Sequence, residues 1–157
     1  MVDRFEKFSF AISEISHYWH KLAADEMEKY GLKGPYSVYF TTLYRYPEGI
    51  TAVNLSELCS RDKSDVSRAV TILENKGLVK RCDVGNNRYR ALVILTDNGK
   101  ALAEKIIAVA ETVTAYVGKD LSKKERAVFY NCLESIISNL QNITKERLSI
   151  VNEEKTV

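Results

Sequence analysis

DKSDVSRAVTILENKGLV, residues 62–79, is the stretch that decides the fold, because it encodes an amphipathic helix with marked ends. Four apolar residues recur at i, i+3, i+4 and i+7, the spacing of one buried helix face: Val66, Ala69, Val70 and Leu73. Asp62 is a candidate N-cap. Gly77 is a candidate left-handed C′ residue that lets Leu78 pack back on Leu73. The stretch therefore predicts a helix over about residues 63–76 that packs on a core.

The opposite face of this helix carries short hydrogen-bonding side chains and one arginine. Its members are Ser64, Ser67, Arg68, Thr71 and Asn75. A face that is only solvated carries Glu and Lys more often, whereas short polar groups beside an arginine allow close approach to base edges and phosphates. We therefore predict DNA contacts from five residues of the helix: Lys63, Ser64, Ser67, Arg68 and Thr71. An ordinary exposed face is the alternative interpretation.

The neighbouring elements predict a helix-turn-helix followed by a wing. A short helix begins at Thr51, a candidate N-cap, and ends near residue 60. After the quoted helix the pattern changes to two strands, over about 78–84 and 89–95, joined by Gly85-Asn86-Asn87, a sequence suited to a tight turn. This hairpin carries four basic residues on or near its tip: Lys80, Arg81, Arg88 and Arg90. In a helix-turn-helix the second helix enters the major groove, so the quoted helix is the predicted recognition helix and the hairpin is the predicted wing.

Long helices flank this central module. The first covers about residues 3–30, another follows the wing to about residue 117, and the last begins after Ser122. The first and last helices carry apolar stripes that the central module cannot fill, so we expect two chains to bury them against each other. A two-fold dimer places two recognition helices about one DNA turn apart, which matches a pseudo-palindromic operator.

The predicted fold class is therefore mainly α with a small β-hairpin. It comprises a winged helix-turn-helix DNA-binding domain with N- and C-terminal dimerisation helices. In a single chain of 157 residues, the DNA-binding region is residues 35–96, and the dimerisation helices are residues 1–34 and 97–157.

The charge distribution favours the same region for contact with nucleic acid. The whole chain has a net charge of only +2, from 23 Lys and Arg against 21 Asp and Glu. Residues 51–96 hold eight basic and five acidic residues, a balance of +3, which leaves 15 minus 16, or −1, for the remainder. Basic side chains gathered on one part of a near-neutral chain are typical of a phosphate-binding surface. A solvated charged face is the alternative, and charge alone does not decide between them.

Several classes of protein are excluded by what the sequence lacks. Its longest aliphatic run, residues 91–95, is far below the roughly 20 residues of a membrane span. No apolar stretch follows a basic start at the N-terminus, so we expect a cytoplasmic protein. We find no phosphate-binding loop, nucleophile–base motif or metal-ligand cluster, so we expect neither an enzyme nor a cofactor. His17 and His20 have metal-compatible spacing, but the sequence shows no third ligand.

Three cysteines are scattered along the chain: Cys59, Cys82 and Cys132. An odd number without pairing pattern predicts reduced thiols rather than a disulfide framework. Arg81 adjoins Cys82, but the sequence shows no clear low-pKa setting for any of the three. Inert thiols are therefore our expectation, and thiol-based redox sensing stays open as an alternative.

Three segments of the central module resemble the MarR (multiple antibiotic resistance regulator) family of winged helix-turn-helix transcription regulators: LSEL at 55–58, DKSDVSR at 62–68 and LENKGLV at 73–79. LTDNG at 95–99 is similar to the family's Leu-Thr-x-x-Gly, where the wing meets the next helix, and LKGP at 32–35 resembles the start of its second helix. The resemblance implies a homodimeric transcription regulator, usually a repressor. It also implies that an effector bound between the dimerisation and DNA-binding regions lowers the DNA affinity.

Four residues are candidates for contact with a small aromatic or phenolic effector of the kind that this resemblance suggests: His17, His20, Tyr36 and Tyr39. The two histidines flank Tyr18 and Trp19 on the first helix, and the two tyrosines open the second. Plain core packing is the alternative interpretation for each of them.

Two departures from the family pattern concern DNA binding. The family's wing tip often has an acid followed by two basic residues, whereas this chain has Asn87-Arg88-Tyr89-Arg90. We carry the family's wing contact over to Arg88 and treat Arg90 as a substitute for the second basic residue. Asp65 stands where the family typically has a neutral residue, so it acts either as a helix cap or as a group that repels phosphate. These departures keep open a winged-helix protein-interaction module without specific DNA binding.

Overall fold

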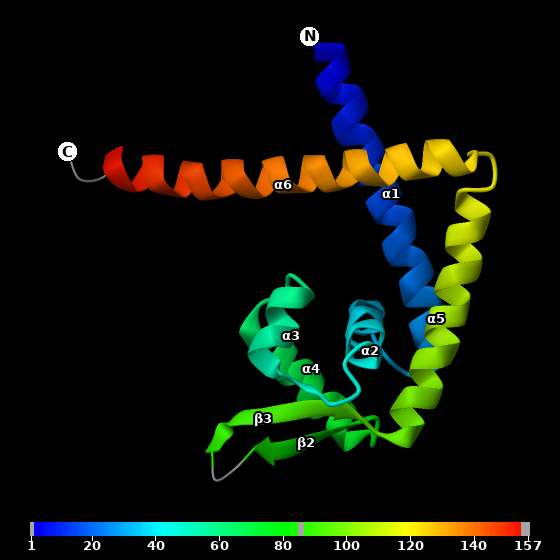
Figure 1. Cartoon of the computed structure of the whole chain (residues 1–157), viewed down its shortest axis with the longest axis vertical. Coiled ribbons are helices and arrows are strands. Elements are labelled where there is room, and N and C mark those ends of the chain that lie inside the picture. Colours follow the sequence, from blue (N-terminus) through cyan, green and yellow to red (C-terminus); the bar gives the residue numbers. More distant parts are fainter. Residues whose placement is uncertain (1, 85–86, 155–157) are drawn as a thin grey trace. The chain divides into compact units, whose positions relative to one another are not determined.

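The computed structural model describes the backbone of residues 2–84 and 87–154, and their side chains apart from those of 2, 5, 84, 87–90 and 145–154. The chain forms two compact units, Met1–Ala110 and Glu111–Val157, which we describe separately. The elements in chain order are α1 (Val2–Glu28), the 3-10 turn η1 (Gly34–Tyr36), α2 (Ser37–Tyr44), β1 (Ile50–Thr51), α3 (Ala52–Leu58), α4 (Lys63–Asn75), β2 (Val79–Val84), β3 (Asn87–Leu95), α5 (Asp97–Val117) and α6 (Lys123–Glu154). The predicted fold class, mainly α with a small hairpin, is confirmed (Figure 1).

The sheet has one strand more than the sequence predicts. Its order is β1-β3-β2, and both pairs are antiparallel. β1 adds Ile50 opposite Val93 and Thr51 opposite Leu92 on the outer edge of β3. Two residues are too few to show an alternating pattern, so the sequence gives no sign of this strand. Thr51 also acts as the predicted N-cap of α3, because its Oγ1 accepts a hydrogen bond from the N–H of Asn54 at 3.2 Å.

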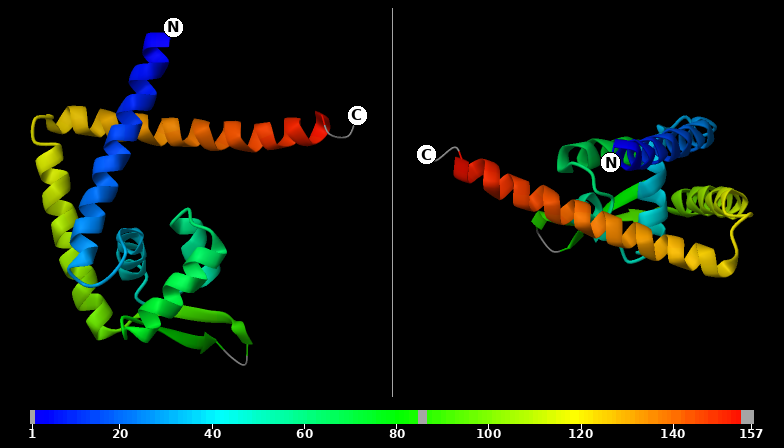
Figure 2. Two further views of the ribbon diagram at one scale, coloured as in Figure 1. Left: turned by 180° about the vertical axis from the view of Figure 1, so that it is seen from behind. Right: turned by 90° about the horizontal axis from the view of Figure 1, so that it is seen from above.

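One hydrophobic core joins the elements of the first unit. It takes side chains from α2, α3, α4, the sheet and the start of α5, among them Phe40, Leu43, Leu55, Val93 and Ala103. The predicted stripe of α4 is confirmed, since none of its four side chains is more than 1% exposed. In Figure 1, α2, α3 and α4 lie on the same side of the β2–β3 hairpin. Figure 2 shows α2 beside the end of α1 and the start of α5, where Tyr44 donates a hydrogen bond to Glu104 at 3.2 Å.

Left-handed residues end both helices of the helix-turn-helix. At the end of α4, Gly77 has φ +69°, its N–H donates to Glu74 O, and the N–H of Leu78 donates to Leu73 O, each at 2.9 Å. This is the predicted Schellman arrangement. At the end of α3 the same pair of bonds surrounds Ser60, which has φ +50° although it is not a glycine. A left-handed residue with a Cβ costs about 1 kcal/mol, which the turn between the two helices must offset.

The LTDNG segment joins α4, the wing and α5 at one point. The hydroxyl of Thr96 donates to Gly77 O at 2.7 Å and accepts from the N–H of Gly99 at 3.1 Å. The N–H of Thr96 donates to Leu78 O at 3.1 Å. A Cβ on Gly99 would lie 1.9 Å from Leu78 O, so only glycine fits here. The LTDNG motif therefore serves two purposes. Thr96 caps the start of α5, and Gly99 allows the backbone of α5 to approach the backbone of Leu78.

The second unit contains the end of α5 and all of α6. Ser122 and Glu125 form a capping box at the start of α6. The N–H of Ser122 donates to Glu125 Oε2 at 2.8 Å, and the N–H of Glu125 donates to Ser122 Oγ at 3.3 Å. These hydrogen bonds hold the pKa of Glu125 below its ordinary value. The last helix therefore begins directly after a capping box at Ser122, in agreement with the predicted start after this residue.

Replacing Gly99 by alanine is expected to lower the free energy of unfolding by about 2–3 kcal/mol, because the new Cβ overlaps the Leu78 carbonyl and one of the two backbones must move. Gly77→Ala is the matched control. It meets no atom within 4 Å, so it bears only the left-handed backbone cost of about 1 kcal/mol. Urea unfolding followed by circular dichroism measures both variants. A loss for Gly99→Ala no larger than that for Gly77→Ala would contradict the packing argument.

Candidate nucleic-acid interface

The outer face of α4 presents the five side chains that the sequence singled out. Each of them is exposed: Lys63, Ser64, Ser67, Arg68 and Thr71. The four buried apolar side chains of the same helix hold its inner face on the core. The face is thus rigidly mounted and open to a large partner.

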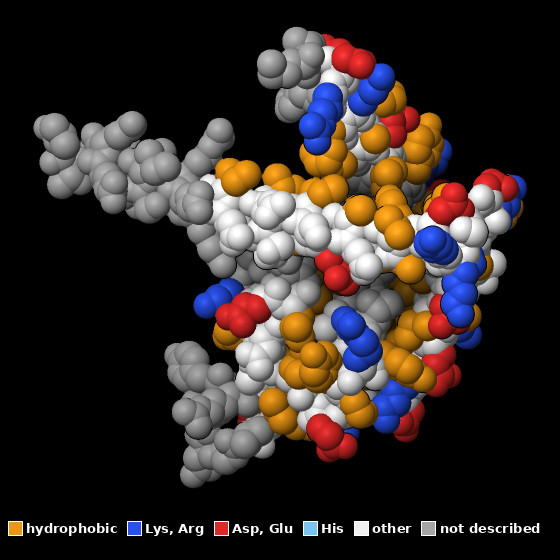
Figure 3. Space-filling view, turned by 45° about the horizontal axis from the view of Figure 1, so that its top comes forward, with side chains coloured by type: hydrophobic (Ala, Val, Ile, Leu, Met, Phe, Trp, Pro, Cys, Tyr) orange, Lys and Arg blue, Asp and Glu red, His pale blue; other side chains and the backbone are white. Residues whose placement is uncertain are grey.

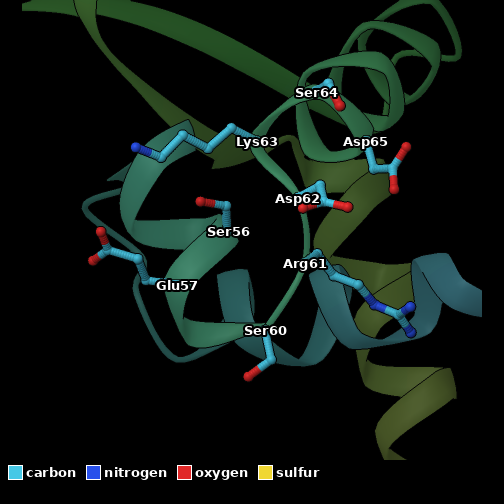
Figure 4. Close-up of a pocket in the computed structure, with 8 residues that line it drawn as sticks. All are labelled: Ser56, Glu57, Ser60, Arg61, Asp62, Lys63, Ser64 and Asp65. Carbon is cyan, nitrogen blue, oxygen red and sulfur yellow. The ribbon is translucent and has the colours of Figure 1, made fainter. Parts of the chain in front are cut away.

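A hollow lies where the turn from α3 meets the first turn of α4 (Figure 4). Its lining carries the basic side chains Arg61 and Lys63 but also three acids, Glu57, Asp62 and Asp65. Figure 4 shows Glu57 and Lys63 to one side of the turn and Arg61 and Asp65 to the other. The opening is therefore lined by both basic and acidic side chains, which is unlike a purely cationic phosphate site.

Asp62 holds the N-cap position of α4 only through its backbone. Its φ of −64° and ψ of 140° are those of an N-cap, but its carboxylate accepts no capping hydrogen bond. The expectation that this side chain caps the helix is therefore wrong in its hydrogen-bonding part. The charge still lies at the positive end of the helix dipole, where a carboxylate is favourable.

Asp65 is an ion-pair partner of Arg68 on the same face of α4. The Nη2 of Arg68 donates to Asp65 Oδ1, and the two side chains are 70% and 54% exposed. An exposed pair three residues apart on a helix adds only about 0.2–0.5 kcal/mol to stability. Neither interpretation of Asp65 from the sequence included this contact. The one arginine of the outer face is thus already held by a carboxylate.

A second network joins α4 to the wing strand β2. The guanidinium of Arg81 donates to Glu74 Oε2 and, at 3.2 Å, to Thr71 Oγ1. The backbone N–H of Arg81 donates to Glu74 Oε1 at 3.3 Å, and the hydroxyl of Thr71 donates to Ser67 O at 3.0 Å. From the sequence we expected Arg81 among the basic residues near the wing tip. In the structure its hydrogen bonds join the wing to the recognition helix. The contact between Glu74 and Arg81 could not be predicted from their seven-residue separation, because it depends on the turn at Gly77.

The wing itself follows the predicted hairpin, with Val79 opposite Leu95 and Arg81 opposite Val93. The backbones of Arg88 and Arg90 belong to β3. Their side chains lie outside the described residues, so their contact with DNA stays a prediction.

Solved structures that are similar to this chain include MarR-family regulators. A MarR transcriptional regulator from Methanosarcina mazei is 26% identical, with a TM-score of 0.75 over 88% of this chain and 92% of that one. MepR of Staphylococcus aureus, solved in complex with DNA, is 22% identical, with a TM-score of 0.77 over 85% and 96% of the two chains. A Listeria monocytogenes protein assigned to the same family, and complexed with a 26mer DNA, is 23% identical, with a TM-score of 0.78 over 84% and 87%.

The chain has the fold of the MarR-family transcription regulators. The resemblance predicted from the sequence is thereby confirmed at the level of the fold. No protein-family model matches the sequence.

The candidate effector residues lie at two places in this MarR-like fold. His17 and His20 line an open hollow on α1 together with Phe8 and Ile12, and the Oγ of Ser16 is 3.2 Å from His20 Nδ1. Tyr36 and Tyr39 instead lie beside each other where η1 meets α2, with their rings tilted by 33° and ring centroids 6.0 Å apart. Tyr39 is 3% exposed and belongs to the core, and this burial raises the pKa of its hydroxyl. The lining of the α1 hollow does not include the tyrosines.

The three thiols differ in their access to solvent. Cys59 is buried, Cys82 is half-buried and Cys132 is exposed, and all three are free. Burial raises the pKa of the Cys59 thiol, and its Sγ lies 3.4 Å from Thr42 Oγ1. Burial therefore disfavours the thiolate form of Cys59, and with it the reaction of this thiol with oxidants.

In the described part of the chain, no group of three or more His, Cys, Asp or Glu side chains is placed to hold a metal ion. Of the helices described, none is both long and apolar enough to cross a membrane.

Glu74→Gln is expected to loosen the wing. Both side chains of the Glu74–Arg81 pair are 35% exposed, so we expect a loss of only about 0.5–1 kcal/mol of unfolding free energy. Hydrogen exchange should be faster at the Arg81 amide and along β2, because that strand loses its tie to α4. Glu57→Gln, which changes an exposed carboxylate on α3 in the same way, is the control. Equal exchange rates along β2 in the two variants would show that this pair does not hold the strand.

Proposed function

We propose that this chain is a sequence-specific DNA-binding transcription regulator. The observation that carries the proposal is the outer face of α4, where short polar side chains and one arginine stand exposed on a helix whose inner face is locked into the core. In this arrangement α4 enters the major groove, and the wing contacts the adjacent backbone or minor groove. Arg88 and Arg90 are the wing residues that we assign to this contact. The DNA complexes of two proteins with the same fold support the assignment.

We further propose that the chain works as a homodimer. α1 exposes a continuous apolar face, on which Ile15 is 62% exposed and Trp19 is 48% exposed. α6 exposes a second such face, with Ile137 at 53% and Leu140 at 49%. Figure 3 shows apolar side chains at the surface of α1 and along α6. Such contiguous apolar surfaces are typical of interfaces, so we assign residues 1–34 and 97–157 to dimerisation.

The proposed regulator is a repressor that a small aromatic or phenolic effector releases from a pseudo-palindromic operator. The apolar hollow on α1 with His17 and His20, and the half-buried ring of Tyr36, support contact with such a molecule. Thiol-based sensing by Cys59 has less support, because this thiol is buried and burial raises its pKa. A protein-interaction role without specific DNA binding is the alternative that the following experiment decides.

Selection from a pool of random duplexes tests specific DNA binding. The wild-type protein should enrich a two-fold-related motif, and fluorescence anisotropy should show tighter binding to the enriched duplex than to a scrambled one. Arg68→Ala should cost about 1–3 kcal/mol of binding to the enriched duplex if Arg68 reaches a base. Asn75→Ala, at the far end of the outer face, is the matched control and should change affinity little. Binding that is independent of sequence at every salt concentration would overturn the proposal.

The dimer is tested by charge on the apolar face of α6. Ile137→Asp with Leu140→Asp should convert a dimer into a monomer in light scattering, because carboxylates cannot be buried there unpaired. Ser138→Asp with Asn142→Asp, on the polar face of the same helix, should leave the dimer intact. All four positions are exposed, so circular dichroism should show unchanged helix content. A wild-type protein that is monomeric at micromolar concentration would contradict the assignment.

A further inference from the structure

We propose that Asp65 is a specificity-determining residue: its carboxylate holds Arg68 as a directional reader of base edges and prevents it from acting as a free cation toward phosphate. The inference rests on the proposed function and concerns the same face of α4. It starts from the ion pair between Arg68 Nη2 and Asp65 Oδ1 at the centre of that face.

The charge of the recognition helix makes this pair consequential. From Lys63 to Asn75 the helix holds two basic residues, Lys63 and Arg68, and two acids, Asp65 and Glu74, so its net charge is zero. Glu74 is paired with Arg81 of β2, and Asp65 with Arg68. Lys63 is therefore the only basic side chain of α4 for which the described residues show no ion-pair partner. Sequence-independent affinity depends on free cations that displace counterions from phosphates, and this helix supplies few of them.

The pair is unsuited to a purely structural role. Its side chains are 70% and 54% exposed, and such a pair contributes little to the stability of a helix in water. The electrostatic interaction between Asp65 and Arg68 becomes stronger when DNA displaces the water around the two side chains. The neutralised pair then gains little from a phosphate, but the unused N–H groups of the guanidinium fork can still donate to guanine O6 and N7.

The Asp65 carboxylate also discriminates between DNA sequences directly. It repels phosphate oxygens and accepts hydrogen bonds only from donors, such as the N4 amino group of cytosine. Wrong sequences that present acceptors to Asp65 are therefore penalised. Asp65 thus lowers the affinity for all DNA. At the same time it raises the ratio of the affinity for the recognised sequence to the affinity for other sequences.

A matched acid on the same turn provides the control. Asp62 lies three residues before Asp65, is exposed, and its carboxylate makes no capping hydrogen bond. Asp62→Asn and Asp65→Asn therefore remove the same charge near the N-terminus of α4, but only the second frees Arg68.

The experiment measures affinities of full-length variants for the duplex enriched by the wild type and for a scrambled duplex of equal length, by anisotropy over a series of salt concentrations. Asp65→Asn should bind the scrambled duplex about 3- to 10-fold more tightly near 0.1 M salt, with a salt slope steeper by about 0.9. Its ratio of affinities for the enriched and scrambled duplexes should fall by at least about 3-fold. Asp62→Asn should change both affinities by the same factor.

The double variant Asp65→Asn with Arg68→Ala assigns the effect to the pair. When Arg68 is already alanine, there is no arginine left to release. Asp65→Asn should then change the ratio of affinities for the enriched and scrambled duplexes no more than Asp62→Asn does. An unchanged ratio in Asp65→Asn, or a change that persists without Arg68, would overturn this inference while leaving the proposed function intact. If the wild type enriches no duplex, the proposed function and this inference both fail.

Discussion

The approach of Gly99 to the Leu78 carbonyl is the constraint on which the rest of the first unit depends. A Cβ would lie 1.9 Å from that oxygen, and the Thr96 hydroxyl bridges Gly77 O and the N–H of Gly99 at the same junction. The end of α4, the base of the wing and the start of α5 therefore meet as three backbones with almost no side chain between them. The direction of the wing relative to the recognition helix follows from this contact.

The outer surface of α4 is also tied to other side chains, although more weakly than its buried inner surface. Its apolar stripe anchors it in the core, and the contacts of Arg81 with Thr71 and Glu74 tie its far end to β2. Asp65 in its first turn holds Arg68 near its middle. Two of the charges expected to bind phosphate are therefore committed to partners within the protein. A surface of this kind favours recognition by shape and hydrogen bonds over attraction by charge alone.

The charge pattern concerns the surface of one chain, whereas the exposed apolar faces concern the assembly of two chains. Residues 51–96 carry a surplus of +3, yet the recognition helix within them is neutral. The wing alone accounts for the surplus, with Lys80, Arg81, Arg88 and Arg90 against Asp83. The exposed apolar side chains of α1 and α6 lie outside the buried hydrophobic core. Their burial in a dimer would set the spacing of two such surfaces, which is where a regulator of this fold obtains much of its selectivity.

The sequence by itself determined the α-helices of the described residues, the hairpin, the buried stripe of α4 and the Schellman turn at Gly77, because each depends on local periodicity or on a single residue's backbone freedom. It also singled out the exposed face of α4. Only the tertiary structure decided the third strand at Ile50 and the partners of Arg68 and Arg81. A two-residue strand shows no period, and an i,i+3 spacing permits an ion pair without requiring one. The contact of Arg81 with Glu74 exists only because the turn at Gly77 folds the wing back along α4.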